Sequence, residues 1–470
     1  MTSTDERPAF ADPALTGPAL TDPALTGPAF AALPGDDGED DAWVIETLRR
    51  HEPATMHTQH PVVWDHASGS RVFDRQGRSW LDWTSGILTA NAGHARPEVV
   101  DAITRQARQG LLHAYMFPTR VRARTVRALA ELSGFPQSVL YTTGAEAVEG
   151  AMKIAARHAQ ARRAAGEGGG EGSRPSVVVT FDGSFHGRTL GAQLAGGLPA
   201  QRDWAPALDE AFLHVPFPAR GEAWSTDVID SAVRAAGARP EDVSCVIGEI
   251  YQGSTLQQLD PAAARELRAW CTRHGALLVF DEIQSGFGRT GALFAYEHVG
   301  VRPDLLLVAK GLSGSLPVSA VLIGDERFAR DVRPGELTST HSGNPISLAA
   351  AEANLALYAD GQLVAEAARR GRQLADGLAD WAARLPGRRR VIGTMGLIAG
   401  IACTREDGSL DPETSKRLAA ACIERGLLVC VPSTLGGAML KIMPPVTTSE
   451  AELAEALARF DAAADAVQRG

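Results

Sequence analysis

Apolar and polar positions follow two different spacings along the middle of the chain. Short continuous apolar runs are typical of strands that are buried on both faces. Such runs occur at residues 176–181, 243–250, 276–283, 305–309 and 319–323. Segments with a helical spacing of apolar residues separate several of them, for example 145–165 and 261–274. Strands that alternate with helices predict an α/β fold with a mostly parallel central sheet.

The two ends of the chain have other patterns. A helical region rich in alanine and leucine runs from about residue 345 to 385, and short strands near 397–402 and 439–443 precede a last helix from Glu450. The N-terminal residues are rich in proline, alanine and glycine, and the block 12–19 recurs at 22–29. This composition predicts a disordered tail rather than a packed repeat. The glycine-rich stretch 166–173 predicts a surface loop.

Composition and charge exclude several classes of protein. The net charge of −10 and the pI near 5.7 argue against a nucleic-acid or anionic-membrane partner. The five cysteines are dispersed and form no Cys-x-x-Cys, which argues against a disulfide framework or a metal site. The start has no apolar stretch of a secretory signal, and no run is long enough for a membrane helix. We therefore expect a cytoplasmic protein.

Polar side chains stand where the expected strands end. Ligands of parallel sheets bind beyond the carboxyl ends of the strands. The residues at or just beyond these ends are Asp182, Phe185, His186, Arg188, Glu249, Asp281, Glu282, Gln284 and Lys310. Lysine is rare in this chain, because only Lys153, Lys310, Lys416 and Lys441 are lysines among 46 basic residues. Lys310, at the end of the apolar run DLLLVAKG, is therefore an unusual choice that needs an explanation.

Each of these features also has an ordinary interpretation. Thr143 before the helix at 145–165 predicts a helix N-cap, Asp281 is typical of a cap or an ion pair, and Lys310 of a solvated sheet edge. The G-x-G-x-x-G pattern at 286–291 suggests a dinucleotide site, but no long helix and no acid-ended strand follow it. The chain also lacks the Gly-x-x-x-x-Gly-Lys-Ser/Thr loop of nucleotide hydrolases.

Three of the features together indicate a particular chemistry. A carboxylate holds a pyridine nitrogen protonated, a lysine forms an imine with an aldehyde, and the N–H groups at a helix N-terminus bind phosphate. Asp281, Lys310 and the segment 142–146 before a helix supply these groups. The combination predicts a site for pyridoxal 5'-phosphate.

At these residues the chain resembles the class III (ω-type, ornithine/4-aminobutyrate-like) aminotransferases of fold type I, from about Trp80 to Val446. The most specific match is the strand end Asp-Glu-x-Gln at 281–284, followed by Gly-x-Gly-Arg-Thr-Gly at 286–291, Pro303-Asp304 and Lys310-Gly311. Further matching segments are Gly93-His94 with Pro97, 143–147, 185–189, Glu249 with Gln252-Gly253, and 340–345.

The resemblance implies a domain organisation. A tail at 1–41 would precede a small α/β domain that is formed by the two end segments, 42–100 and 361–470. The large cofactor-binding domain with the mostly parallel sheet would span 101–360. The active unit would be a homodimer with shared active sites.

The resemblance also implies cofactor contacts. Lys310 would form the imine and serve as the base that removes the substrate Cα proton, and Asp281 would pair with the pyridinium nitrogen. Gln284 would hydrogen-bond the phenolic oxygen, and Glu249 would orient Gln284. Arginine could not replace Lys310, because it stays protonated.

The remaining cofactor contacts come from three other segments. Phe185 would stack on the ring, with His186 beside it. The amides of Gly144 and Ala145 would bind the phosphate. Thr340 would reach the phosphate of the other subunit's cofactor.

The substrate positions depart from the family pattern. The expected substrate-binding residues are Ile87, Tyr115, Arg188 and Lys441. Lys441 stands where the family often has an arginine that grips a carboxylate, and Ser254 stands where a glutamate shields that arginine. Ile87 replaces a tyrosine of ornithine aminotransferases and a glutamine of dialkylglycine decarboxylases. These changes indicate a substrate other than a standard α,ω-amino acid.

The functional hypothesis is transfer of an amino group between a primary amine or amino acid and an aldehyde or keto acid. The hypothesis includes an aldehyde acceptor on a sugar or polyamine. It also includes a role in secondary metabolism, such as aminoglycoside synthesis. Two alternatives are left open at this point. One is an epimerase or aminomutase on the same scaffold, and the other is a non-catalytic binding protein, which the joint presence of Lys310 and Asp281 disfavours.

Overall fold

The computed structural model describes residues 40–56, 62–167, 176–383, 389–431 and 437–469. The predicted tail and most of the glycine-rich stretch at 166–173 lie outside these residues. The chain divides between Val63 and Trp64 into two compact units. In the first unit, helix α1 (Asp41–His51) is capped by Asp40, whose side chain accepts the N–H of Trp43 at 2.8 Å.

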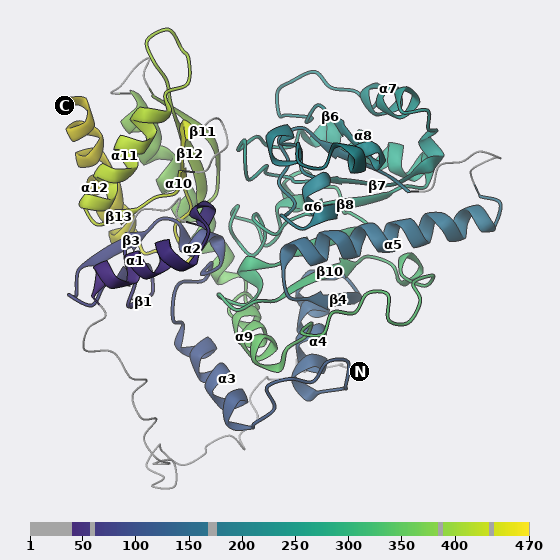
Figure 1. Cartoon of the computed structure of the whole chain (residues 1–470), viewed down its shortest axis with the longest axis horizontal. Coiled ribbons are helices and arrows are strands. Elements are labelled where there is room, and N and C mark those ends of the chain that lie inside the picture. Colours follow the sequence, from purple (N-terminus) through teal and green to yellow (C-terminus); the bar gives the residue numbers. More distant parts are fainter. Residues whose placement is uncertain (1–39, 57–61, 168–175, 384–388, 432–436, 470) are drawn as a thin grey trace, which may run out of the picture. The chain divides into compact units, whose positions relative to one another are not determined.

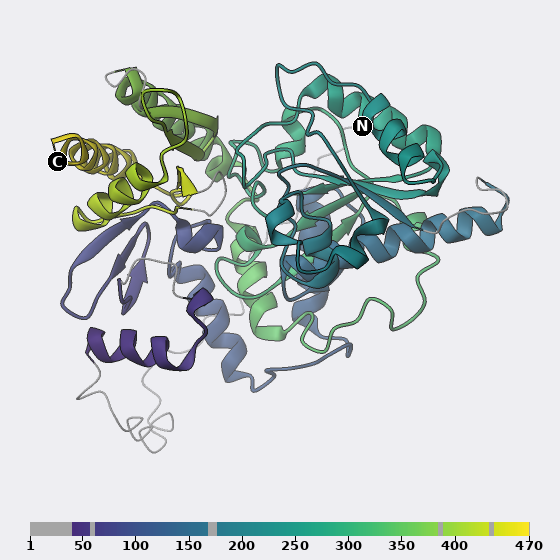
Figure 2. The same cartoon turned by 45° about the horizontal axis from the view of Figure 1, so that its top comes forward.

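The second unit is built around a seven-stranded sheet (Figures 1 and 2). In spatial order its strands are β4 (Gln137–Tyr141), β10 (Ser319–Ile323), β9 (Leu305–Val308), β8 (Leu277–Asp281), β7 (Val243–Gly248), β5 (Val177–Phe181) and β6 (Phe212–Val215). Neighbours from β9 to β6 all pair parallel. The prediction of a mostly parallel sheet, with strands at the five apolar runs, is confirmed.

Strand β10 is the exception, since it runs antiparallel to both β9 and β4. A parallel neighbour of β9 would need a crossover connection of roughly a dozen residues or more, usually a helix. Only the short segment 309–318 joins β9 to β10, and its regular structure is a single 3₁₀ turn at Lys310–Leu312. The chain therefore turns back along β9 at the residues that follow the predicted lysine.

The two faces of the sheet bury alternate residues of each strand. On one face, Leu277, Val279, Leu305 and Leu307 pack with helix α5 (Gly144–Ala164) in one apolar cluster. The intervening residues belong to a second cluster that includes α7 (Asp227–Ala235) and α8 (Pro261–His274). Figures 1 and 2 show these helices on opposite sides of the sheet. Burial on both faces explains why the strands read as continuous apolar runs.

Further helices pack around this core. They are α2 (Ser85–Leu88), α3 (Pro97–Arg108), α4 (Arg120–Ser133), α6 (Leu190–Leu194), α9 (Pro345–Ala356), α10 (Gln362–Ala383), α11 (Pro412–Glu424) and α12 (Glu450–Arg469). The predicted helical region from 345 to 385 is thus two helices, separated by a turn with Gly361 at φ 72°. Among the described residues, no helix is both long and apolar enough to cross a bilayer.

Two small sheets join segments that are far apart in sequence. In one, β1 (His66–Ser68), β2 (Arg71–Phe73) and β3 (Ser79–Asp82) are extended by β13 (Leu427–Leu428), which pairs parallel with β3. The other contains β11 (Arg389–Met395), β12 (Ile398–Cys403) and β14 (Met439–Ile442). Strands from the N-terminal and C-terminal parts of the chain therefore share a sheet.

Candidate active site

Three neighbouring strands bring the candidate side chains to one edge of the central sheet. β8 ends at Asp281, Glu249 follows the last residue of β7, and Lys310 lies two residues beyond β9. Because these strands are parallel neighbours, their carboxyl ends meet at the same edge. Residues from this edge line a cavity of about 370 Å³, which we call the site cavity. Its walls include Gly144, Ala145, Phe185, His186, Asp281, Gln284 and Lys310.

A carboxylate and an imidazole form a buried pair in the wall of the site cavity. His186 Nδ1 lies 2.8 Å from Asp281 Oδ2, and Asp281 Oδ1 accepts the N–H of Ile283 at 3.0 Å. Burial lowers the pKa of the His186 imidazole, but the hydrogen bond and charge of Asp281 outweigh burial, so this pKa is raised. Among the described residues, His186 Nε2 is buried without a hydrogen-bond partner.

Lys310 is held in an unusual backbone conformation beside this pair. Its φ of 39° lies in the left-handed region, which side chains other than glycine rarely adopt. Burial lowers the pKa of its amine, although the charges of Asp281 and Glu249 oppose that effect. No hydrogen bond or ion pair holds this amine within the part of the chain that the structure describes. The amine is therefore available to react and easier to deprotonate than an ordinary lysine.

The N-terminus of α5 supplies backbone N–H groups to the site cavity. Thr143 and Glu146 form a capping box: Thr143 Oγ1 accepts the Glu146 N–H at 3.2 Å, and Glu146 Oε2 accepts the Thr143 N–H at 2.8 Å. The N-cap interpretation of this sequence is thus correct. It uses different N–H groups from those of Gly144 and Ala145, which stay in the cavity wall. Capping and anion binding are therefore compatible here.

Two glycines let the walls of the site cavity approach each other. A Cβ on Gly187 would lie 2.6 Å from the Cβ of Ala145, and a Cβ on Gly144 would lie 2.9 Å from Ile283 Cδ1. Gly187 also has φ 140°. These contacts press the loop that carries Phe185 and the loop after β8 against the start of α5.

Glu249 lies behind the cavity wall. Its Oε2 accepts the N–H of Phe185 at 3.1 Å, and its Oε1 accepts the N–H of Gly253 at 2.9 Å. Burial raises the pKa of Glu249 to about 7, against the opposing charge of His186. The expectation that Glu249 orients Gln284 remains a prediction. Backbone amides occupy both of its oxygens, because they stabilise a buried carboxyl group where solvent cannot.

Lys441 makes a direct hydrogen bond to the side chain of Gln284. The Lys441 ammonium donates to Gln284 Oε1 at 2.8 Å and to the carbonyl of Gly253 at 2.7 Å. Lys441 is only 5% exposed and is not part of the cavity lining. Burial lowers its pKa to about 8. The expected substrate contact of Lys441 therefore remains a prediction, while its contacts with the protein are specific.

The other expected positions lie outside the cavity lining. Ile87, Tyr115, Arg188 and Thr340 are all exposed. The Arg188 guanidinium lies 5.6 Å from the centre of the Phe185 ring, at the margin of the cavity wall. Ile87 and Tyr115 have positive φ angles of 58° and 49°. Their roles, and that of Thr340 toward a second subunit, remain predictions.

Some lining residues were not predicted from the sequence. Thr89, Ser315 and Pro317 belong to this group, whereas Thr142 lies in the predicted segment 142–146 but had no role assigned to it. Among the described residues, the hydroxyl of Thr142 is buried without a hydrogen-bond partner. A hydroxyl residue just before a helix start was a usable signal for Thr142. No comparable pattern marks the return toward β10, where Ser315 has φ 115°.

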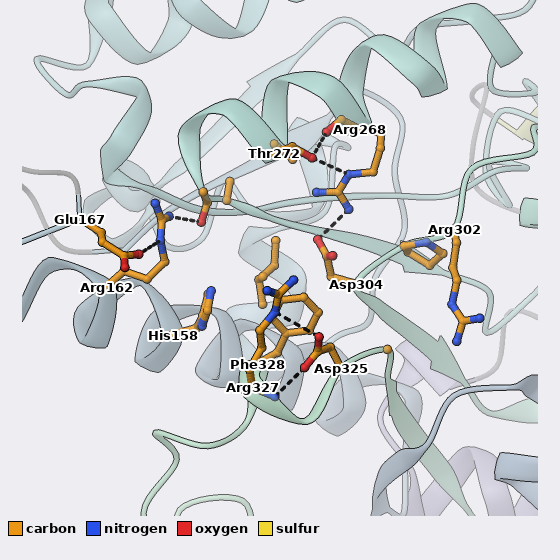
Figure 3. Close-up of a pocket in the computed structure, with 16 residues that line it drawn as sticks. His158, Arg162, Glu167, Arg268, Thr272, Arg302, Asp304, Asp325, Arg327 and Phe328 are labelled. Carbon is orange, nitrogen blue, oxygen red and sulfur yellow. Dashed lines mark hydrogen bonds and ion pairs between the residues drawn. The ribbon is translucent and has the colours of Figure 1, made fainter. Parts of the chain in front are cut away.

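A larger hollow of about 710 Å³ lies at the opposite edge of the sheet, near the amino ends of β8 and β9 (Figure 3). Its arginines already have partners: Arg268 pairs with Asp304 at 2.8 Å and Arg327 with Asp325 at 3.2 Å. Arg162 donates to a backbone carbonyl at 2.6 Å. None of the residues of the site cavity line this hollow. The chemically distinctive groups are therefore in the smaller cavity.

Comparison with known proteins identifies this arrangement. The family model for class III aminotransferases matches residues 53–464. The chain belongs to the class III aminotransferases. It is therefore a pyridoxal-phosphate-dependent aminotransferase of fold type I, as the sequence predicted.

Individual relatives cover nearly the same span. The 2-aminoadipate transaminase of Pseudomonas putida is 35% identical over 84% of this chain and 94% of its own length. An acetylornithine aminotransferase of Thermosynechococcus vestitus is 32% identical over 86% and 92% of the two chains. The solved structure of an ornithine aminotransferase from Toxoplasma gondii superposes with a TM-score of 0.80 at 26% identity, over 92% and 96%.

The residues of the site cavity fit pyridoxal phosphate. Its three requirements are an amine that forms an imine, a carboxylate for the ring nitrogen and N–H groups at a helix start for the phosphate. Lys310, Asp281 and the Gly144–Ala145 amides meet them within one cavity. The close approach at Gly187 leaves no room for side-chain atoms between this loop and the helix start.

Replacing Asp281 by asparagine should lower the pKa of His186. Asparagine keeps a hydrogen-bond acceptor but removes the negative charge, so burial of the imidazole dominates. In the wild type, protonation of His186 stabilises the folded protein, because its pKa is raised above the ordinary value of 6.5. This stabilisation is fully present below pH 6.5 and is lost as the pH rises through the raised pKa of the folded protein. NMR titration of the imidazole in cofactor-free protein measures this pKa. Asp182→Asn, at an exposed carboxylate just after β5, is the control, and an unchanged His186 pKa in Asp281→Asn would contradict the assignment.

Proposed function

We propose that this aminotransferase exchanges an amino group between a carboxylate-bearing amino acid and a carbonyl acceptor, with Lys310 as the group that moves the Cα proton. The observation that carries the proposal is the amine of Lys310, which has no partner among the described residues and lies beside the buried Asp281–His186 pair. Its lowered pKa favours the neutral amine, and only the neutral amine can accept a proton.

In this proposal each wall of the site cavity holds one part of the cofactor. The N–H groups of Gly144 and Ala145 hold the phosphate, and the Phe185 ring covers one face of the cofactor ring. Asp281 holds the ring nitrogen in its protonated form. The contact with His186 fixes the position of the Asp281 carboxylate. When bound, the cofactor supplies the carbon that takes the amino group and a ring that stabilises negative charge at the substrate carbon.

Gln284 donates to the phenolic oxygen of the cofactor ring in this proposal, and Glu249 acts indirectly, through the backbone. By accepting the N–H groups of Phe185 and Gly253, Glu249 fixes the backbone on which the ring-stacking side chain and the Gln284 amide rest. Its role is positioning rather than contact with the cofactor.

The substrate class follows from the charges around the cavity. Both kinds of curated relative named above act, by their names, on amino acids, 2-aminoadipate and acetylornithine. A substrate carboxylate needs a cation near the cavity mouth. Arg188 is exposed and lies beside Phe185, whereas the Lys441 ammonium is buried and donates to two oxygens of the protein. We therefore assign the carboxylate to Arg188.

A homodimer is part of the proposal. The segment 111–117 between α3 and α4 exposes the side chains of Leu111, Leu112, Tyr115, Met116 and Phe117, and Phe117 is 74% exposed. A cluster of exposed large apolar side chains is typical of a protein interface. It lies beside the expected Thr340 segment, because Asn344 donates to the Leu112 carbonyl at 2.8 Å and the rings of His113 and His341 are 5.2 Å apart.

Replacing Lys310 by alanine should remove the visible absorbance that depends on the lysine–cofactor bond and lower turnover by roughly 10³-fold or more. Amino-group exchange between a panel of amino acids, amines, keto acids and sugar aldehydes measures turnover. Lys153→Ala, at an exposed position of α5, is the control. A wild-type protein that stays colourless with added pyridoxal phosphate would falsify the proposal. Solvent deuterium at Cα without net transfer would indicate an epimerase instead.

Replacing Arg188 by glutamine should raise KM about tenfold for donors that carry a carboxylate, because one charge-assisted hydrogen bond is lost. The kinetics of an amine that lacks a carboxylate should not change, so this amine is the matched control. Steady-state kinetics of the two donors separates the outcomes. An equal loss for both donors, or no loss for either, would rule out carboxylate binding by Arg188.

The wild-type chain should sediment at twice its mass of 49.6 kDa. Replacing Met116 and Phe117 by aspartate should give monomers, since two charges cannot be buried in an apolar interface. Cofactor affinity should fall in parallel if Thr340 of one subunit serves the other subunit's site. Leu410→Asp, at another exposed apolar position, is the control. Analytical ultracentrifugation and cofactor titration measure both effects, and a dimer that persists in the double variant contradicts this interface.

A further inference from the structure

Lys441 is a buried cation whose ammonium is satisfied by neutral oxygens. It lies on β14, and its ammonium donates to the Gln284 side-chain oxygen at 2.8 Å and to the Gly253 carbonyl at 2.7 Å. Within the described residues it forms no ion pair at 4.0 Å or less. Retaining a charge in a buried position without a counter-ion is costly, so these two hydrogen bonds are what keep it there.

The Gln284 side chain is confined on a second side by Gly253. A Cβ on Gly253 would lie 2.1 Å from Gln284 Nε2, so the amide packs directly on the glycine backbone. Gly253 is itself fixed through its N–H, which donates to Glu249 at 2.9 Å. The amide thus lies between a fixed backbone and the Lys441 ammonium, in the wall of the site cavity.

This confinement decides which end of the amide is available to a ligand. A lysine ammonium has three donors and no acceptor, so the atom that faces it is the amide oxygen. The amide N–H₂ group is then the end that remains for a group in the cavity. Without Lys441, the two ends of the amide could exchange places at little cost, because they have nearly the same shape.

We propose that Lys441 is a positioning residue that fixes the Gln284 amide with its N–H₂ group toward the ring oxygen of the cofactor, and that it does not bind substrate. This inference rests on the proposed role of Gln284. A positive charge on the amide oxygen also polarises the amide and strengthens its N–H donors. Lys441 therefore makes the cavity wall selective for a ligand that places a hydrogen-bond acceptor next to the Gln284 N–H₂ group.

The test compares two ligands that do not bond covalently to Lys310. One is pyridoxamine 5'-phosphate, and the other is its analogue without the ring hydroxyl. Their dissociation constants are measured on the full-length, cofactor-free chain by calorimetry. Lys441→Met should weaken pyridoxamine phosphate about tenfold, the value of one hydrogen bond to a charged group, and leave the analogue unchanged. Lys441→Arg, which keeps the donor, should retain most of the difference between the two ligands.

A second variant covers the case in which Lys441→Met does not fold. Gln284→Glu keeps the shape and gives Lys441 a carboxylate partner, but it offers only acceptors to the cavity. It should lose affinity for pyridoxamine phosphate and not for the analogue. Lys416→Met, at an exposed lysine of α11, is the control for the loss of a charge.

The pH dependence supplies a readout that a merely structural lysine would not change. The charged or titratable groups around Lys441 are Cys430, Glu249, Lys310 and Arg289. Burial lowers the pKa of Lys441 to about 8, so it is charged below that pH and loses its preference for the amide oxygen above it. The wild-type advantage of pyridoxamine phosphate over the analogue should shrink as pH rises through about 8. In Lys441→Arg the advantage should persist, because arginine stays charged.

The outcomes separate this inference from the proposed function. Equal weakening of both ligands in Lys441→Met, or no weakening of either, overturns the positioning role while the function stands. Failure of the wild-type chain to bind either ligand overturns the proposed function itself. Weakening that is confined to the ligand with the ring hydroxyl supports both.

Discussion

The buried guanidinium of Arg289 joins parts of the chain that are far apart in sequence. It is fully buried and donates to Asn91 Oδ1 at 2.7 Å, to the Leu397 carbonyl at 2.8 Å and also to the Pro444 carbonyl. Burying a cation costs several kcal/mol unless hydrogen bonds replace its water. Here, they come from three separate segments, so the cation is tolerated only when all three are in place.

That constraint reaches the active site through short stretches of chain. Arg289 lies five residues after Gln284, and Pro444 lies three residues after Lys441. The hydrogen bond from Arg289 to the Pro444 carbonyl therefore joins the segment that carries Gln284 to the segment that carries Lys441. This contact lies outside the site cavity, since neither Arg289 nor Pro444 lines it. Gly396 permits the same junction, since a Cβ there would lie 2.3 Å from the backbone of Thr290.

Several ionisable groups of the site have pKa values that burial shifts. Burial raises the pKa of Glu249 to about 7 and that of Glu282 to about 8, and it lowers that of Lys310. Each carboxyl group accepts two backbone N–H groups, Glu282 from Ala295 and Tyr296. These hydrogen bonds hold the two carboxyl groups in fixed positions before a ligand arrives. Preorganisation of this kind is the usual source of electrostatic catalysis.

The sequence itself determined the strands of the central sheet, the main cofactor residues and the family. Continuous apolar runs specified the strands, because a strand buried on both faces has no polar alternation. Asp281 and Lys310 both stand at the carboxyl ends of predicted strands, and ligands of parallel sheets bind at that edge. The sequence therefore predicted that the two residues belong to one site. The signature at 281–291 was specific enough to name the family, and the family model agrees over 53–464.

Only the tertiary structure decided what each polar group contacts. Sequence motifs place Gln284, Glu249 and Lys441 near one site, but hydrogen-bond partners depend on how the end segments fold back onto the large sheet. The antiparallel course of β10 depended on a short connection, which brought Ser315 and Pro317 into the cavity wall. The role proposed for Lys441 depends on a distance of 2.8 Å between residues that are far apart in the chain. A pattern along the chain carries no information about such a distance, because long-range packing sets it.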